Sequence, residues 1–96
     1  MNSIVAGGTV IAGGGVSRSV LGNRVYILDG ATVEDSILFT GATVGEGARV
    51  RRAIVDRGVS IPADEEIGLD PARDAERFHV TPAGVVVIPS DFRFND

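Results

Sequence analysis

The stretch "ATVEDSILFTGATVGEGARVRRAIV" (residues 31–55) contains one short pattern twice, 17 residues apart. Ser36-Ile37-Leu38 returns as Ala53-Ile54-Val55, and Ser19-Val20-Leu21 stands 17 residues before the first copy. Counting outward in steps of 6, 6 and 5 residues places Val, Ile or Leu at all twelve positions of three rows. The rows are Ile4, Leu21, Leu38 and Val55; Val10, Ile27, Val44 and Ile61; and Val16, Val33, Val50 and Ile67. A repeat of this length is typical of a chain that coils back onto itself.

A second set of residues, two positions before these aliphatics, is mostly Gly, Ala or Ser. Its members are Gly8, Gly14, Ser19, Val25, Ala31, Ser36, Ala42, Ala48, Ala53 and Val59. Residues two apart in an extended chain point to the same side. Three short strands per coil then describe a triangular prism, with large side chains stacked inside and coils pairing as parallel strands about 4.8 Å apart. We therefore predict an all-β fold, a parallel β-helix of hexapeptide repeats.

The repeat has limits at both ends. Glu65 occupies the next small position and breaks the pattern, so the prism is expected to end near residue 68, after about four coils. In the first coil, the inward residue could be Val5 instead of Ile4. Asp70-Pro71 is a helix N-cap followed by proline, and residues 78–89 fit two strands around a turn. We predict one domain, with the β-helix at 1–68 and a short helix plus hairpin cap at 69–96.

One outward row is apolar. Val20, Ile37 and Ile54 stand one position before large inward residues, and Phe39 lies beside them. Outward aliphatics on three consecutive coils would form a contiguous apolar stripe, which proteins in water usually cover. Two explanations stay open: the C-terminal hairpin folds back over the stripe, or the stripe is an interface with another domain or subunit.

Composition excludes several classes of partner. No stretch approaches the roughly 18 consecutive apolar residues of a membrane-spanning helix, and the N-terminus lacks the features of a signal peptide. We therefore expect a cytoplasmic protein with no membrane contact. The net charge of −4 argues against nucleic acid as a partner. The absence of cysteine excludes disulfides and thiolate metal sites.

Charged residues also stack from coil to coil. Arg18, Asp35 and Arg52 share one row, which favours a structural ladder of ion pairs. Arg57 is different, because the residue one coil back is Thr40 and offers no opposite charge. A guanidinium without a partner at a corner is either ordinary surface or an anion site.

Catalytic chemistry is hard to find in this sequence. The one histidine, His79, lies beyond the coils, whereas hexapeptide-repeat acyltransferases use a histidine on or beside the prism as general base. A zinc site like that of prism-shaped carbonic anhydrases needs three histidines. A stand-alone acyltransferase and a purely structural assembly module are nevertheless kept as alternatives.

Three phrases resemble the C-terminal left-handed β-helix domain of bacterial ADP-glucose pyrophosphorylase (glucose-1-phosphate adenylyltransferase). They are "NSIVAGGTVIAGGGVSRSVLGNRVYI" (2–27), "RVRRAIVDRGVSIPADEEIG" (49–68) and "DAERFHVTPAGVVVI" (74–88). The resemblance implies a left-handed coil and a part in glycogen biosynthesis. That family is a nucleotidyltransferase that converts ATP and glucose 1-phosphate into ADP-glucose and pyrophosphate with Mg²⁺. Its catalytic residues lie in an N-terminal domain that is absent here, so this chain alone is not expected to be catalytic or to hold a cofactor.

The resemblance also implies partners and sites. The family forms homotetramers, and its C-terminal prism contributes subunit contacts and part of an allosteric site for a sugar-phosphate activator and an AMP or phosphate inhibitor. The family's regulatory arginine falls in the phrase "VDRG", which is Arg57 in this chain. The resemblance favours Val20, Ile37, Ile54 and Phe39 as an interface with the missing catalytic domain or a neighbouring subunit. The far C-terminus, "SDFRFND", lacks the basic tail of some relatives.

Overall fold

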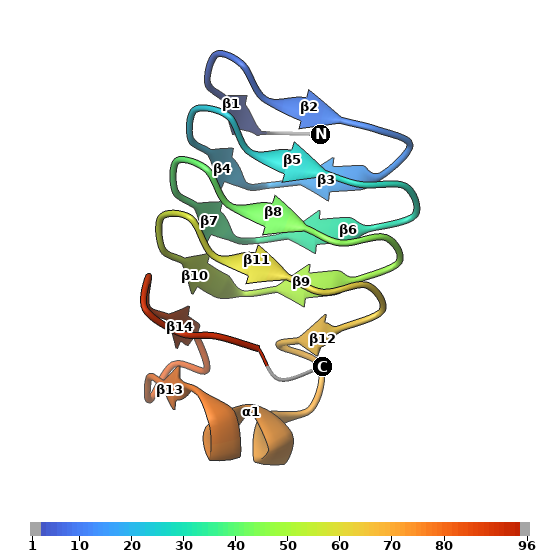
Figure 1. Cartoon of the computed structure of the whole chain (residues 1–96). Coiled ribbons are helices and arrows are strands. Elements are labelled where there is room, and N and C mark those ends of the chain that lie inside the picture. Colours follow the sequence, from blue (N-terminus) through green and yellow to red (C-terminus); the bar gives the residue numbers. More distant parts are fainter. Residues whose placement is uncertain (1–2, 95–96) are drawn as a thin grey trace.

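Short parallel strands stack into three sheets, one along each side of a triangular prism (Figure 1). The computed structural model describes residues 3–94. The first side contains β1 (Ile4–Val5), β4 (Val20–Leu21), β7 (Ile37–Leu38) and β10 (Ala53–Val55). The second contains β2 (Val10–Ile11), β5 (Tyr26–Ile27), β8 (Thr43–Val44) and β11 (Ser60–Ile61). The third contains β3 (Gly15–Ser17), β6 (Thr32–Glu34), β9 (Arg49–Arg51) and β12 (Glu66–Ile67).

The three aliphatic columns predicted from the repeat fill the prism from the second coil onward. Leu21, Leu38 and Val55 are in register on neighbouring strands, and each is at most 1% exposed. The other two columns are buried in the same way and comprise Ile27, Val44, Ile61, Val33, Val50 and Ile67. Burying one such side chain contributes about 1.5–3 kcal/mol. The fold class predicted from the sequence, a parallel solenoid of about four coils, is therefore confirmed.

The first coil corrects the predicted register. Val5 pairs with Leu21, and Ile11 pairs with Ile27. The inward residues of this coil are therefore Val5 and Ile11. The alternative register with Val5 inward is confirmed, and the row positions Ile4 and Val10 were wrong by one residue. The reason is a coil that is one residue shorter. The left-handed corner glycine Gly13 follows Ile11 by two positions, whereas Gly30 follows Ile27 by three positions in the next coil.

Side-chain hydroxyls bind one coil to the next at a corner of the prism. Ser19 Oγ donates to the Ser17 carbonyl oxygen at 2.8 Å and accepts from the Ser36 amide at 3.1 Å. Ser36 Oγ repeats this arrangement one coil later with Glu34 and Ala53. The serines in the small row therefore satisfy buried backbone groups where the chain turns.

A helix and a hairpin close the end of the stack opposite the N-terminus (Figure 1). The helix α1 (Pro71–Arg77) begins at the N-cap Asp70, whose carboxylate accepts from the Arg73 amide at 3.3 Å. The strand β13 (His79–Val80) pairs antiparallel with β14 (Val86–Ile88), and β14 also pairs parallel with β10. The predicted short helix and C-terminal hairpin are thus present. No helix among residues 3–94 is long and apolar enough to span a membrane.

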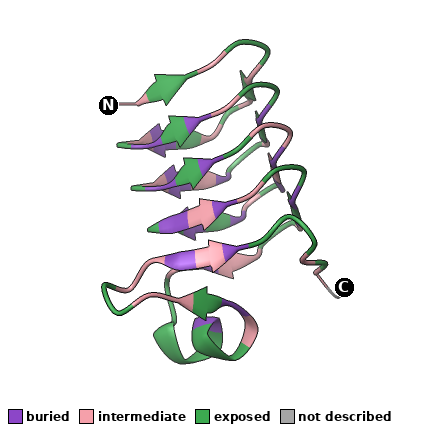
Figure 2. Ribbon diagram, turned by 90° about the vertical axis from the view of Figure 1, so that its left-hand side faces the viewer, coloured by how far each residue is buried: buried purple, intermediate pink, exposed green. Residues whose placement is uncertain are grey.

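The hairpin does not cover the apolar stripe, so that explanation was wrong. Because β14 lies beside β10 in the same sheet, it extends the stripe and leaves its outer face open. Ile54 is in register with Ile37 on one side and with Val87 on the other. Figure 2 shows the result, with exposed residues on β1, β4 and β7 and half-buried ones on β10 and β14.

Candidate functional site

Arg57 lies at the corner that joins β10 to β11. Its backbone amide donates to Asp56 Oδ1 at 2.7 Å, and the next residue, Gly58, has a left-handed φ of 70° that turns the chain into β11. The Arg57 side chain is exposed. Among residues 3–94 no hydrogen bond or ion pair engages its guanidinium, which agrees with the absence of an opposite charge at Thr40. Its donors are therefore available to a ligand.

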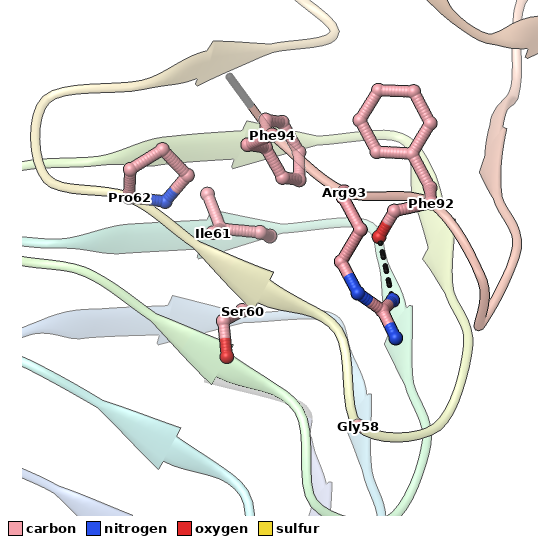
Figure 3. Close-up of a pocket in the computed structure, with 7 residues that line it drawn as sticks. All are labelled: Gly58, Ser60, Ile61, Pro62, Phe92, Arg93 and Phe94. Atoms are coloured by element: carbon pink, nitrogen blue, oxygen red, sulfur yellow. Dashed lines mark hydrogen bonds between the residues drawn. The ribbon is translucent and has the colours of Figure 1, made fainter. Parts of the chain in front are cut away.

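A hollow of about 460 Å³, here called the corner pocket, lies beside this corner (Figure 3). Its lining residues are Gly58, Ser60, Ile61, Pro62, Phe92, Arg93 and Phe94. Arg57 adjoins this pocket through Gly58 and does not itself line it. Figure 3 shows the guanidinium of Arg93 pointing toward the corner that contains Gly58. The pocket thus has one arginine in its wall, and a second arginine directly precedes a lining residue in the sequence.

Sequence reasoning missed Arg93. Its Nη1 donates to the backbone oxygens of Ser90 and Phe92, each at 3.2 Å, which holds the side chain along the tail. Phe92 and Phe94 fix the tail by packing on Phe78, with ring centroids 5.0 and 5.9 Å away. The available signal was the alternation Phe92-Arg93-Phe94, in which two aromatic residues flank the arginine.

Four other arginines on the prism are engaged in ion pairs or backbone contacts: Arg18, Arg49, Arg51 and Arg52. Arg18 binds Asp35 through two contacts of 2.7 and 3.2 Å, and this hydrogen bond holds the pKa of Asp35 below its usual range. Arg52, predicted to continue this ladder, instead donates to the Ala83 carbonyl oxygen at 2.9 Å. Arg52, the third residue of the row, is therefore bound to the hairpin and does not continue the ladder of ion pairs. This contrast separates Arg57 from these four arginines. Arg24, exposed between β4 and β5 at the same corner of the prism, resembles Arg57, because among residues 3–94 no ion pair or hydrogen bond engages its guanidinium either.

The predicted interface residues lie together on the outer face of one sheet. Val20, Ile37 and Phe39 are 41%, 39% and 44% exposed, and Ile54 is half-buried. No described residue packs over this face, because the hairpin lies at its edge. The structure brings the four side chains onto one surface, and their role as an interface stays a prediction.

The acidic side chains and the histidine of the described residues do not gather into a metal-binding cluster. Within residues 3–94 no group of three or more His, Cys, Asp or Glu side chains could hold a metal ion. His79 is exposed on β13. Asp74 is buried, and burial raises the pKa of its carboxyl group, but this group accepts the Gly68 amide at 3.0 Å. Its contact is therefore structural.

Comparison with known proteins identifies close relatives. A protein from Vibrio cholerae named glucose-1-phosphate adenylyltransferase 2 is 44% identical over 95 residues, which is 99% of this chain and 23% of the relative. Glucose-1-phosphate adenylyltransferase from Rhodopirellula baltica is 52% identical over 92% of this chain and 20% of its own length. The protein of that name from an Arthrobacter species is 51% identical over 92% of this chain and 19% of its own length. The chain thus spans about a fifth of these relatives.

One protein-family model matches most of the chain. The model described as "GlmU-like, C-terminal hexapeptide" matches residues 1–88. This range includes every coil of the prism, the helix α1 and both strands of the hairpin. The chain therefore belongs to the family of GlmU-like C-terminal hexapeptide domains.

Proposed function

We propose that this chain is the regulatory and oligomerisation domain of a glucose-1-phosphate adenylyltransferase, acting with a catalytic part that lies outside it. The observation that carries the proposal is the identity of 44–52% over nearly the whole chain to enzymes of that name. The parent reaction would join ATP and glucose 1-phosphate in glycogen biosynthesis, with Mg²⁺ held by the catalytic part. The prism would supply the surfaces for assembly and a contact for the effector.

The effector contact would be made by Arg57. Arg57 is exposed and directly precedes Gly58, which lines the corner pocket, and Arg93 in the wall of that pocket supplies a second positive charge. Guanidinium groups bind phosphate oxygens through paired hydrogen bonds, which suits a sugar-phosphate activator and an AMP or phosphate inhibitor. The lining residues of the corner pocket all come from the last coil and the tail. Further contacts to the effector would come from the catalytic part of the enzyme.

In the complete enzyme we expect Arg57→Ala to raise the half-saturating concentration of activator and of inhibitor by about tenfold, since a charge-assisted hydrogen bond is lost. The basal rate should stay within about threefold, because Arg57 would touch no reacting atom. Initial rates over an effector titration measure both quantities. Arg18→Ala is the control, because Arg18 is similarly exposed but paired with Asp35. Unchanged effector curves for Arg57→Ala would leave a purely structural assembly module as the better account.

The apolar stripe would be the contact with the catalytic part or a neighbouring subunit. It is continuous over several coils, and a buried charge in such a contact is costly. We expect Ile37→Asp and Ile54→Asp to weaken co-purification with the catalytic part by about tenfold or more. The melting temperature of the isolated chain should change little in Ile37→Asp, because Ile37 is 39% exposed. The main effect of this substitution should be on assembly.

Tyr26→Asp provides the matched control for the stripe. Tyr26 is 40% exposed, close to the 39% of Ile37, but lies on the outer face of the second sheet. It should assemble normally if the stripe is the interface. Normal assembly of both stripe variants would instead show that this face stays open in the complete enzyme. No observation favours an acyltransferase, because His79 stands on the hairpin away from the coils.

A further inference from the structure

The first coil of the prism, residues 3–17, leaves the aliphatic columns open at the end near the N-terminus (Figure 2). Its inward side chains Val5 and Ile11 are 47% and 39% exposed, whereas Leu21 and Ile27, which follow them in the same columns, are at most 1% exposed. At the opposite end, β14 extends the first sheet and the column residue Ile67 is fully buried. Among residues 3–94 the prism is therefore covered at one end and open at the other.

The backbone of the first coil also has an open edge. The amides of Ile4 and Ala6 donate to carbonyl oxygens of the second coil, each at 2.9 Å. Neighbouring residues of a strand direct their N–H and C=O groups to opposite sides, so those of Val5 point away from the second coil. Ile11 is placed in the same way, because the residues on both sides of it donate their amides to the second coil. Such unpaired groups are a template for another strand.

The sequence of the first coil does not protect this edge. Proteins usually keep an exposed sheet edge from pairing by placing charged side chains or proline on it. Residues 3–17 contain neither, although the whole chain has nine basic and 13 acidic residues. The outward side chains Ile4 and Val10 add to the exposed apolar surface, at 69% and 50% exposure. An apolar edge without these devices indicates a surface that another neutral, extended segment covers.

The repeat indicates which segment fits the edge. Successive coils pair as parallel strands, and a residue meets its counterpart 16 or 17 positions further along the chain, as Val5 meets Leu21 and Val16 meets Val33. A segment stacked above the first coil in the same way would therefore come directly before it in the same polypeptide. A strand joined to the edge by so short a connection has an effective concentration in the millimolar range or above.

The length of the relatives provides such a segment. This chain spans about a fifth of the adenylyltransferases that it matches, so most of the parent polypeptide lies outside it. The proposed function places the catalytic part before the prism. The polypeptide that joins the two parts then enters at the open end, where the N-terminus lies (Figure 1).

We propose that the segment directly before this chain in the parent polypeptide forms a further coil on the first one, so that the catalytic part and the prism share one continuous sheet. The inference rests on the proposed function. Aliphatic side chains of that segment, about 16 or 17 positions before Val5 and Ile11, complete the columns. Its backbone pairs with the free N–H and C=O groups of the same two residues.

Hydrogen exchange tests this pairing in the complete enzyme and in the isolated 96-residue chain, by mass spectrometry with residue-resolved fragmentation. We expect the amides of Val5 and Ile11 to exchange at least about tenfold more slowly in the complete enzyme, because each gains a hydrogen bond there. The amide of Ile27, at the equivalent position one coil later, should be protected in both. Equal exchange of the Val5 and Ile11 amides in the two proteins would overturn the proposal.

Ile11→Asp should abolish the added protection at Val5 in the complete enzyme, because a carboxylate would be buried between the two coils. Val10→Asp is the matched control, since Val10 is 50% exposed and points outward, and it should keep the protection. If Ile11→Asp keeps the protection as Val10→Asp does, no coil covers the columns and the proposal fails.

Sedimentation of the isolated chain examines the other possible occupant, a second copy. A dimer in which the Val5 and Ile11 amides are protected, and which Ile11→Asp dissociates, would assign the edge to a second copy and overturn the proposal. ADP-glucose formation and the effector response of Arg57→Ala in the complete enzyme test the proposed function separately. Both could be normal while the Val5 and Ile11 amides stay unprotected, so failure of this inference is distinguishable from failure of that function.

Discussion

Gly68→Ala should lower the free energy of unfolding by about 3 kcal/mol or more. Gly68 ends the last coil with φ of 85°, a left-handed conformation that costs about 1 kcal/mol or more for alanine. A Cβ at this position would also collide with the carbonyl oxygen of Arg51 on the preceding coil. Backbone atoms in the stacked sheet can move little, so the turn into α1 would be distorted. Urea-induced unfolding followed by circular dichroism measures the loss.

Gly58→Ala is the matched control for this prediction. Gly58 has a similar φ of 70°, but a Cβ there meets no atom within 4 Å. It should therefore lose only the backbone contribution, about 1 kcal/mol. If the two variants lose the same free energy of unfolding, then Gly68 does not lie against the Arg51 carbonyl oxygen as described.

Leu38→Ala should lower the free energy of unfolding by about 2–5 kcal/mol, because it leaves a cavity in the middle of a column. Leu38 is 1% exposed and lies between Leu21 and Val55 on the neighbouring coils. The strands on both sides are hydrogen-bonded in register, so the coils cannot collapse to fill the space. Thermal and urea-induced unfolding measure the change.

The neighbouring residue gives the control. Ile37 belongs to the same strand, points outward and is 39% exposed. Ile37→Ala should therefore cost less than about 1 kcal/mol. If Ile37→Ala lowers the free energy of unfolding more than Leu38→Ala does, then Ile37 points inward and Leu38 outward. That result would contradict the register.

The inner columns could be predicted from the sequence because the coil is both the repeat and the packing unit. A residue that recurs after 17 positions meets its own counterpart, so Leu21, Leu38 and Val55 had to stack once the chain coiled. The outward direction of Ile37 followed from the two-residue period of a strand. Contacts between residues far apart in the sequence can be predicted from the repeat, since each coil contacts only the coils next to it.

The first coil was mispredicted because its apolar residues come in adjacent pairs. Ile4-Val5 and Val10-Ile11 fit the rows in either register, and hydrophobicity alone does not choose between them. The corner glycines carry the missing information. Gly8 and Gly13 are five residues apart, whereas Gly41 and Gly47 are six apart, which reveals the shorter coil. Left-handed corners are therefore a better guide to register than the aliphatics.

The corner pocket and the contacts of α1 were the least predictable features. Arg57 could be singled out because its row offers no partner, but Arg93 and Arg73 lie outside the repeat, where counting gives no positions. Glu65 was recognised only as the break in the small row. Its contacts with Arg73 and Arg77 depend on how α1 folds back beneath the last coil, which no local pattern describes.

Nuclear Overhauser contacts between methyl groups test the stacked columns most directly. In a chain labelled at the Leu and Val methyls, we expect cross-peaks linking Leu21 to Leu38 and Leu38 to Val55, because successive coils are about 4.8 Å apart. Absence of both cross-peaks in the folded chain, with the same methyls fully assigned, would contradict it.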